Sequence, residues 1–208
     1  MKNKLGQFAQ RPRRYWFEDG LTELVSGGLF LLIGVFSLIE GLAPPHSQIM
    51  RIGGIAGLIT MMVGPWLARP IIRWLKERLT YPRTGYVSFR QPKKSRRAIT
   101  MIVALIVSAA VVWILMLLPG SLDWIPLIEG AAVGTFLFYQ GQSFNLTRFY
   151  ILATLAAALG VGLSLAGIGN LVGMGLFFIV MSLAILFSGG LTLHNYIEQA
   201  PPPMESHS

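Results

Sequence analysis

Residues 149–197 decide the fold, and they read FYILATLAAALGVGLSLAGIGNLVGMGLFFIVMSLAILFSGGLTLHNYI. These 49 consecutive positions contain no Lys, Arg, Asp or Glu, and so long an uncharged stretch is typical of membrane-spanning helices. One helix of this length would extend for about 73 Å, whereas the hydrocarbon core of a bilayer is only about 30 Å thick. The chain must therefore turn back within the stretch, and Gly167-Ile168-Gly169-Asn170 predicts where it turns.

Four further apolar segments precede this stretch, so the sequence predicts an all-α, polytopic membrane bundle of six transmembrane helices. The expected spans are residues 21–42, 52–67, 98–119, 124–140, 146–167 and 171–193. The fourth is the weakest, because its apolar side chains barely offset Glu129 and Pro126. We expect neighbouring helices to enclose it. If it forms a re-entrant loop instead, the C-terminus moves to the other side of the membrane.

Composition and charge agree with this architecture. Of the 208 residues 53% are apolar and only 12% are charged, which excludes a disordered chain or a coiled coil. The absence of cysteine excludes disulfides, thiolate metal sites and thiol catalysis. All 17 Lys and Arg residues except Arg51 fall on one predicted side of the membrane. Because positive loops stay inside, we expect both termini in the cytosol.

The expected organisation has five parts along the chain. It consists of a basic cytosolic N-terminal segment (1–20), the first two spans (21–69), a basic cytosolic loop with an interfacial helix (70–97), four further spans (98–193) and a cytosolic tail (194–208). The interfacial helix is expected because Pro70 should end the second span. Beyond it, apolar residues recur on one side of a segment that also carries Arg73, Lys76 and Arg78.

Small residues form stripes along several spans. Gly27, Gly34 and Gly41 share a face of the first span, and Gly175, Ser182 and Gly189 recur every seven residues in the last. Helices in lipid associate by close packing, which small residues permit. The stripes therefore favour helix contacts, with a path for a solute as the alternative.

Two carboxylates within the spans, Glu23 and Glu129, form a possible intramembrane polar site, since a charge at this depth needs a partner. Glu23-x4-Gly28-x-Phe30-Leu31 aligns with Glu129-x4-Gly134-x-Phe136-Leu137, which hints at an inverted three-plus-three repeat. For Glu23 a purely structural role is the alternative. In that case Asp19 caps the first helix, and Glu23 lies in the first turn, where the helix dipole favours a negative charge.

The loop after the second span carries the other candidate residues. Turn signals at Tyr81-Pro82 and Thr84-Gly85 precede an alternating segment and a polybasic run. Contact with anionic lipid headgroups or a protein partner is possible at seven positions: Arg83, Tyr86, Arg90, Lys93, Lys94, Arg96 and Arg97. The alternative is that the run serves only to orient the chain in the membrane.

Two segments carry a resemblance to a known group of proteins. Residues 17–23 (FEDGLTE) and 80–87 (TYPRTGYV) are similar to motifs in small, uncharacterised multi-pass membrane proteins of prokaryotes. The resemblance covers 15 of 208 residues and implies a location in a prokaryotic cytoplasmic membrane and a multi-pass architecture, with no catalytic or binding residue. Both motifs are expected to face the cytosol, with Glu18 or Asp19 pairing with Arg83 or Arg90.

Enzymatic chemistry finds no support in the sequence. His46, His194 and His207 lack metal-site spacing, and no nucleophile stands beside a base, so neither catalytic residues, nor a metal, nor a cofactor is expected. No module of sufficient size for nucleic acid lies outside the spans. The sequence favours a non-enzymatic structural, interaction or regulatory membrane component, with the lipid bilayer, anionic headgroups, a homo-oligomer or another protein as partners. The alternative is a small-solute or ion transporter or a channel subunit.

Overall fold

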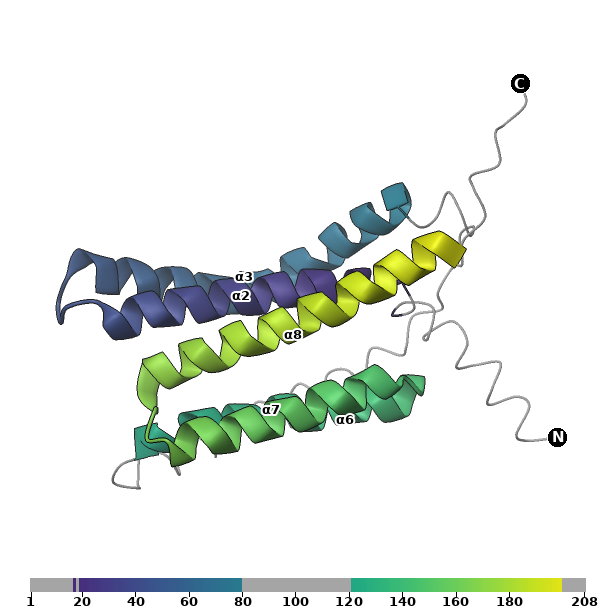
Figure 1. The fold of residues 1–208 in the computed structure, drawn as a ribbon. Helices are drawn as coiled ribbons and strands as arrows, with labels where there is room; N and C mark the ends of the chain where they lie inside the picture. Colours follow the sequence, from purple (N-terminus) through teal and green to yellow (C-terminus); the bar gives the residue numbers. More distant parts are fainter. Residues whose placement is uncertain (1–16, 18, 80–120, 200–208) are drawn as a thin grey trace, which may run out of the picture.

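The computed structural model describes Phe17, residues 19–79 and residues 121–199. Five α-helices and one short 3-10 helix contain most of these residues, and no strand occurs among them. The elements are α2 (Leu21–Leu42), α3 (Gln48–Leu79), η1 (Ser121–Trp124), α6 (Ile125–Phe144), α7 (Thr147–Leu165) and α8 (Asn170–Gln199) (Figure 1). The expected all-α class is therefore confirmed.

Four of these helices, α2, α3, α7 and α8, are long and apolar enough to cross a membrane. The α2 helix has the predicted bounds, and α6 to α8 differ from the predicted spans by a few residues at their ends. Helix α6 is not among the four, which agrees with the low hydrophobicity of the predicted span at 124–140. The predicted third span, 98–119, lies outside the described residues.

The turn between α7 and α8 lies where the sequence predicts it. Gly167 and Asn170 both have left-handed backbone conformations, with φ of 67° and 64°. Glycine adopts this conformation without strain, and asparagine tolerates it better than most other residues. The chain therefore reverses within four residues, and α7 and α8 run in opposite directions.

The prediction that the helix of the second span ends at Pro70 is wrong. Helix α3 continues through Pro65 and Pro70 to Leu79, so the expected interfacial segment is part of the same helix. A proline inside a helix removes one backbone hydrogen bond and bends the axis without necessarily ending it. Figure 1 shows the second half of α3 turning away from α2. The residues after Pro70 are called the α3 extension below.

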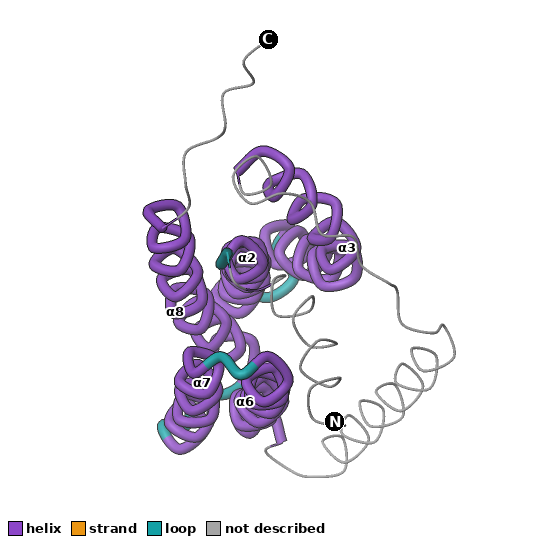
Figure 2. Tube along the Cα trace, turned by 90° about the vertical axis from the view of Figure 1, so that its right-hand side faces the viewer, coloured by secondary structure: helices purple, strands orange, loops and turns teal. Residues whose placement is uncertain are grey.

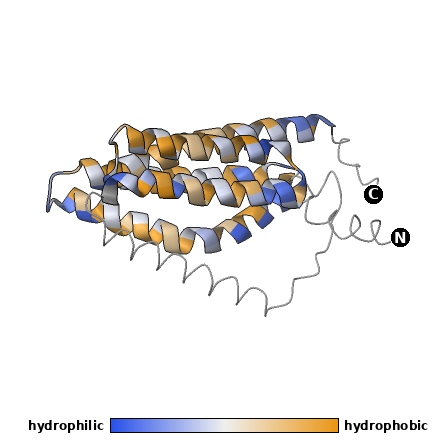
Figure 3. Cartoon of the chain, turned by 90° about the horizontal axis from the view of Figure 1, so that it is seen from below, coloured by the Kyte–Doolittle hydropathy of each residue, from blue (hydrophilic) through white to orange (hydrophobic). Residues whose placement is uncertain are grey.

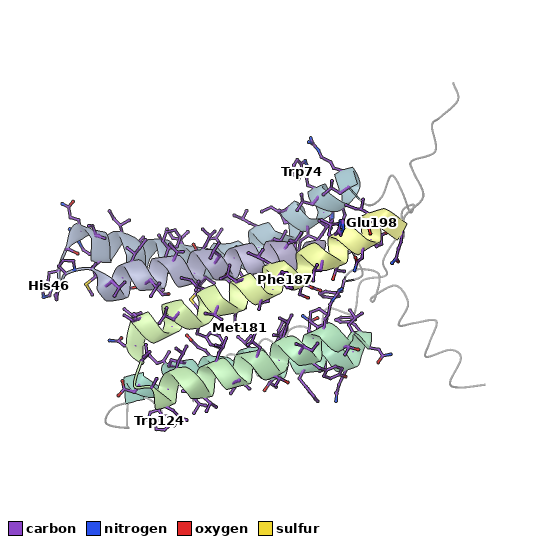
Figure 4. The ribbon with its side chains drawn as sticks, in the orientation of Figure 1. His46, Trp74, Trp124, Met181, Phe187 and Glu198 are labelled. Carbon is purple, nitrogen blue, oxygen red and sulfur yellow. The ribbon has the colours of Figure 1, made fainter. Side chains whose placement is uncertain are left out.

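Helices α2 and α7 run in one direction and α3, α6 and α8 in the other, so the bundle has two distinct ends. Helices α3, α6 and α8 finish at the end where α2 and α7 begin. Five basic residues lie toward this end, and we call it the basic end: Arg69, Arg73, Lys76, Arg78 and Arg148. The other end holds the α2–α3 turn and η1. Figure 4 accordingly places Trp74 and Glu198 at the basic end and His46 and Trp124 at the opposite end.

Glycine contacts hold α2 against α8. A Cβ atom on Gly34 would lie 2.9 Å from the carbonyl oxygen of Gly175, and one on Gly189 would lie 3.0 Å from the carbonyl oxygen of Gly20. The backbones therefore approach too closely for larger residues, as expected for small-residue packing in lipid. Gly130 and Gly160 bring α6 and α7 together in the same way. The small-residue stripes of the first and last predicted spans therefore lie where α2 and α8 touch, as the sequence predicts.

Apolar side chains cover the outside of the bundle as well as its core. Met181 is fully buried in α8 within a cluster that also includes Phe149 and Leu152 of α7. On α3, by contrast, Met62 and Trp66 are 74% and 80% exposed. Figure 2 shows the helices gathered side by side, and Figure 3 shows hydrophilic residues concentrated toward their ends. An apolar exterior between polar ends is consistent with a membrane protein.

Candidate functional site

Glu23 anchors a buried polar cluster at the basic end. Its side chain is only 3% exposed, and Oε1 lies 2.8 Å from Nη2 of Arg148 in the first turn of α7. Oγ of Ser188 on α8 donates a hydrogen bond of 3.0 Å to Oε2 of Glu23. Arg148 also donates to the backbone carbonyl of Phe17 and, at 2.6 Å, to Oγ1 of Thr192. The cluster therefore connects α2, α7 and α8.

Asp19 makes a second buried ion pair beside the first. Its Oδ2 lies 2.5 Å from Nζ of Lys76 on the α3 extension, and the two side chains are 4% and 1% exposed. Its Oδ1 accepts a hydrogen bond of 3.2 Å from the backbone N–H of Leu21, so Asp19 also supports the start of α2. The N-cap position itself belongs to Gly20, whose φ of 71° is left-handed.

Together the two pairs tie the start of α2 to three other helices. Burying charges costs free energy, and an ion pair recovers this cost only with good geometry and further hydrogen bonds. Glu23 accepts such a hydrogen bond from Ser188, and Arg148 donates one to Thr192. We infer a positioning role, because each pair fixes the direction from which a helix approaches α2.

Sequence reasoning missed Arg148 and Lys76 as the partners of these carboxylates. Arg148 was the one basic residue expected on the cytosolic side between the fourth and fifth spans. Arg148 and Glu23 are each the third residue of a predicted span, so the sequence predicts them at a similar depth in the membrane. Their similar depth could have suggested the ion pair. The proposed partners of Asp19, Arg83 and Arg90, lie outside the described residues, as do Tyr86 and the polybasic residues up to Arg97.

Glu129 does not join Glu23. It lies near the start of α6, at the opposite end of the bundle, whereas Glu23 lies near the start of α2 at the basic end. Its Oε2 is buried and has no hydrogen-bond partner in the part of the chain that the structure describes. The two carboxylates therefore do not form one site, although opposite ends are where an inverted repeat would place them.

A cavity of about 610 Å³ lies between α2, α3 and α6, and side chains of α7 and α8 complete its wall. Small-molecule sites typically have volumes of about 300 to 1,000 Å³. Most of the wall is apolar, including Phe30, Ile33 and Phe136. Among the described residues that line it, the polar or charged ones are Thr22, Glu23, Ser26, Thr60, Arg69 and Gln140. We call this space the central cavity.

The described residues contain no candidate metal site, because no three of their His, Asp and Glu side chains lie close enough together to hold an ion. Comparison with known proteins adds no function, because no family model, curated protein or solved structure matches the chain. Three features of the described residues therefore bear on function. They are the two buried ion pairs, the exposed basic residues beside them and the central cavity.

Proposed function

We propose that the protein crosses a prokaryotic cytoplasmic membrane six times, with both termini in the cytosol. Two observations support this. The end of α3 and the start of η1 lie at opposite ends of the bundle, as a further crossing between them would require. The described basic residues other than Arg51 are on helices α3 and α7 and lie toward the basic end, which the positive-inside rule assigns to the cytosol.

Cysteine labelling tests this topology without background, because the chain contains no cysteine. Gln48→Cys and Gln199→Cys introduce exposed thiols at opposite ends of the bundle. In intact cells, a membrane-impermeant maleimide should label position 48, and label position 199 only after the membrane is opened. Labelling of position 199 in intact cells would overturn the proposed orientation.

We further propose a non-enzymatic interaction role for the basic end. Lys76 and Arg148 hold the bundle together there, whereas Arg73 and Arg78 on the α3 extension are exposed. The guanidinium of Arg78 lies over the ring of Trp74, with its Cζ atom 4.4 Å from the ring centroid. Tryptophan and arginine together are typical of the membrane interface, where each basic residue gains about 1 kcal/mol near anionic lipid. The exposed pair of Trp74 and Arg78 is the observation that supports the proposal.

Anionic lipid should therefore stabilise the protein through the α3 extension. We expect the wild type to unfold at a higher temperature in phosphatidylglycerol discs than in phosphatidylcholine discs, and added salt to reduce the difference. Arg73→Gln/Arg78→Gln should reduce this gain, whereas Arg51→Gln at the opposite end should leave it unchanged. An equal gain in the double variant would exclude the extension as the contact.

A transporter or channel subunit is the second candidate, and one observation favours it. The central cavity lies between the α2–α3 pair and the α6–α7 pair, which α8 joins. Transporters built from two related halves bind their substrates at this kind of junction. Dose-dependent solute uptake into proteoliposomes that Ser26→Val abolishes would favour transport over the interaction role.

A further inference from the structure

We propose that the central cavity holds one acyl chain of an anionic phospholipid, with the headgroup at the basic end. The proposal does not rest on the interaction role of Arg73 and Arg78, because it concerns a half-open space between the helices that different residues line. It argues against transport through this cavity, because a resident acyl chain would fill the space that a solute needs.

The size of the cavity fits one hydrocarbon chain. A water molecule occupies about 30 Å³ of liquid, and a methylene group is of similar size. A volume of about 610 Å³ therefore has room for roughly twenty such groups, which is enough for one ordinary acyl chain. The second chain of the lipid would stay in the bilayer.

The wall of the cavity is apolar along the part that an acyl chain would contact. Leu29 and Ile33 contribute from α2, Val133 and Leu137 from α6, and Leu152 from α7. Thr60 is a polar exception at this depth, and its hydroxyl already donates to the carbonyl oxygen of Ala56 at 2.8 Å. A water-filled space with such a wall would leave apolar surface hydrated, so a hydrocarbon occupant is favoured.

Charge at the mouth of the cavity favours an anionic headgroup. The carboxylate of Glu23 lines the cavity, but Arg148 balances its negative charge. Arg69 also lines the cavity and is exposed, and no ion pair with a described residue involves it. Gln140 lies on the last turns of α6, near the same end. A phosphate at this position would gain a guanidinium and an amide donor.

The amphiphilic wall distinguishes a lipid from other occupants. A free inorganic anion would use Arg69 and leave the apolar part empty, whereas a hydrocarbon without a headgroup would leave Arg69 unused. An anionic phospholipid uses both parts, and the surrounding bilayer supplies it.

Lipid retention in detergent tests the proposal with a matched pair of variants. Ala132 lines the cavity, whereas its neighbour Ala131 does not, and both are exposed residues of α6. After reconstitution with phosphatidylglycerol and phosphatidylcholine and extensive washing, native mass spectrometry should find one phosphatidylglycerol per wild-type chain. Ala132→Trp should reduce this retention at least tenfold, and Ala131→Trp should retain lipid like the wild type. Arg69→Gln should remove the preference for phosphatidylglycerol, whereas Arg51→Gln should keep it.

A second measurement keeps the test valid if Ala132→Trp does not fold. Phe136 lines the cavity and Phe138 does not, and both are exposed on α6. The chain already contains five tryptophans, so the quenching of the wild type is subtracted from that of each variant. A small fraction of brominated phosphatidylglycerol in phosphatidylcholine should then quench the added tryptophan of Phe136→Trp to saturation. The tryptophan of Phe138→Trp should be quenched only in proportion to the lipid fraction.

Three outcomes would overturn the proposal. They are no retained lipid in the wild type, equal retention by the two alanine variants, and retention of free fatty acid in place of phospholipid. The first would indicate that water or another segment of this chain fills the cavity.

Discussion

Replacing Arg148 with alanine should destabilise the bundle by about 3 to 5 kcal/mol, a large part of the stability of an ordinary domain. The substitution leaves the Glu23 carboxylate buried, with Ser188 as its remaining described partner. It also removes the hydrogen bonds to Thr192 and to the backbone of Phe17. Loss of an ionic partner is costly because the other charge stays buried and uncompensated. Thermal or denaturant unfolding in a constant detergent measures the effect.

A double variant separates the ion pair from general damage to the helix ends. Glu23→Gln/Arg148→Met removes both charges, so it should be more stable than Arg148→Ala alone. The exposed pair of His194 and Glu198, with side chains 68% and 64% exposed, provides the matched control. Glu198→Ala should change stability by less than about 1 kcal/mol, because solvent screens exposed pairs. If Arg148→Ala costs no more than Glu198→Ala, the buried pair does not hold the bundle together.

Much of the helical framework could be predicted because it depends on local sequence. The bounds of α2 follow from one apolar run, and the turn at Gly167 and Asn170 follows from residues that favour a left-handed backbone. The course of α3 could not be predicted in the same way. A proline near a span boundary fits both an end and a bend, and contacts such as Asp19 with Lys76 stabilise the continued helix.

The candidate site was predicted less well, because its contacts join distant parts of the chain. Glu23 was recognised as a carboxylate that needs a partner, but its spacing along the sequence does not identify Arg148. That choice depends on how α2, α7 and α8 pack, and glycine contacts set the approach of α2 to α8. Glu129 is a second example. Its sequence surroundings resemble those of Glu23, but the two carboxylates lie at opposite ends of the bundle.

Replacing Gly34 with valine should separate α2 from α8 and destabilise the protein by about 1 to 3 kcal/mol. A Cβ atom at this position would lie 2.9 Å from both the carbonyl oxygen of Gly175 and the backbone nitrogen of Ile179. Both are backbone atoms, so a rotamer change cannot relieve the contact and the helices must move apart. Because close packing drives helix association in lipid, the loss should exceed any gain in helix propensity. Unfolding under the conditions used for Arg148→Ala measures it.

The same substitution at Gly28 provides the control. A Cβ atom on Gly28 would meet nothing within 4 Å, although Gly28 lies on the same helix less than two turns away. Gly28→Val should therefore be neutral or slightly stabilising, since valine has a higher helix propensity than glycine. Gly175→Val approaches the same contact from α8, where its Cβ would lie 2.9 Å from the carbonyl oxygen of Gly34. It should therefore be destabilised like Gly34→Val. Equal stability of the Gly28 and Gly34 variants would mean that this close approach does not hold the two helices together, and the Glu23 cluster would then have to position α8 without it.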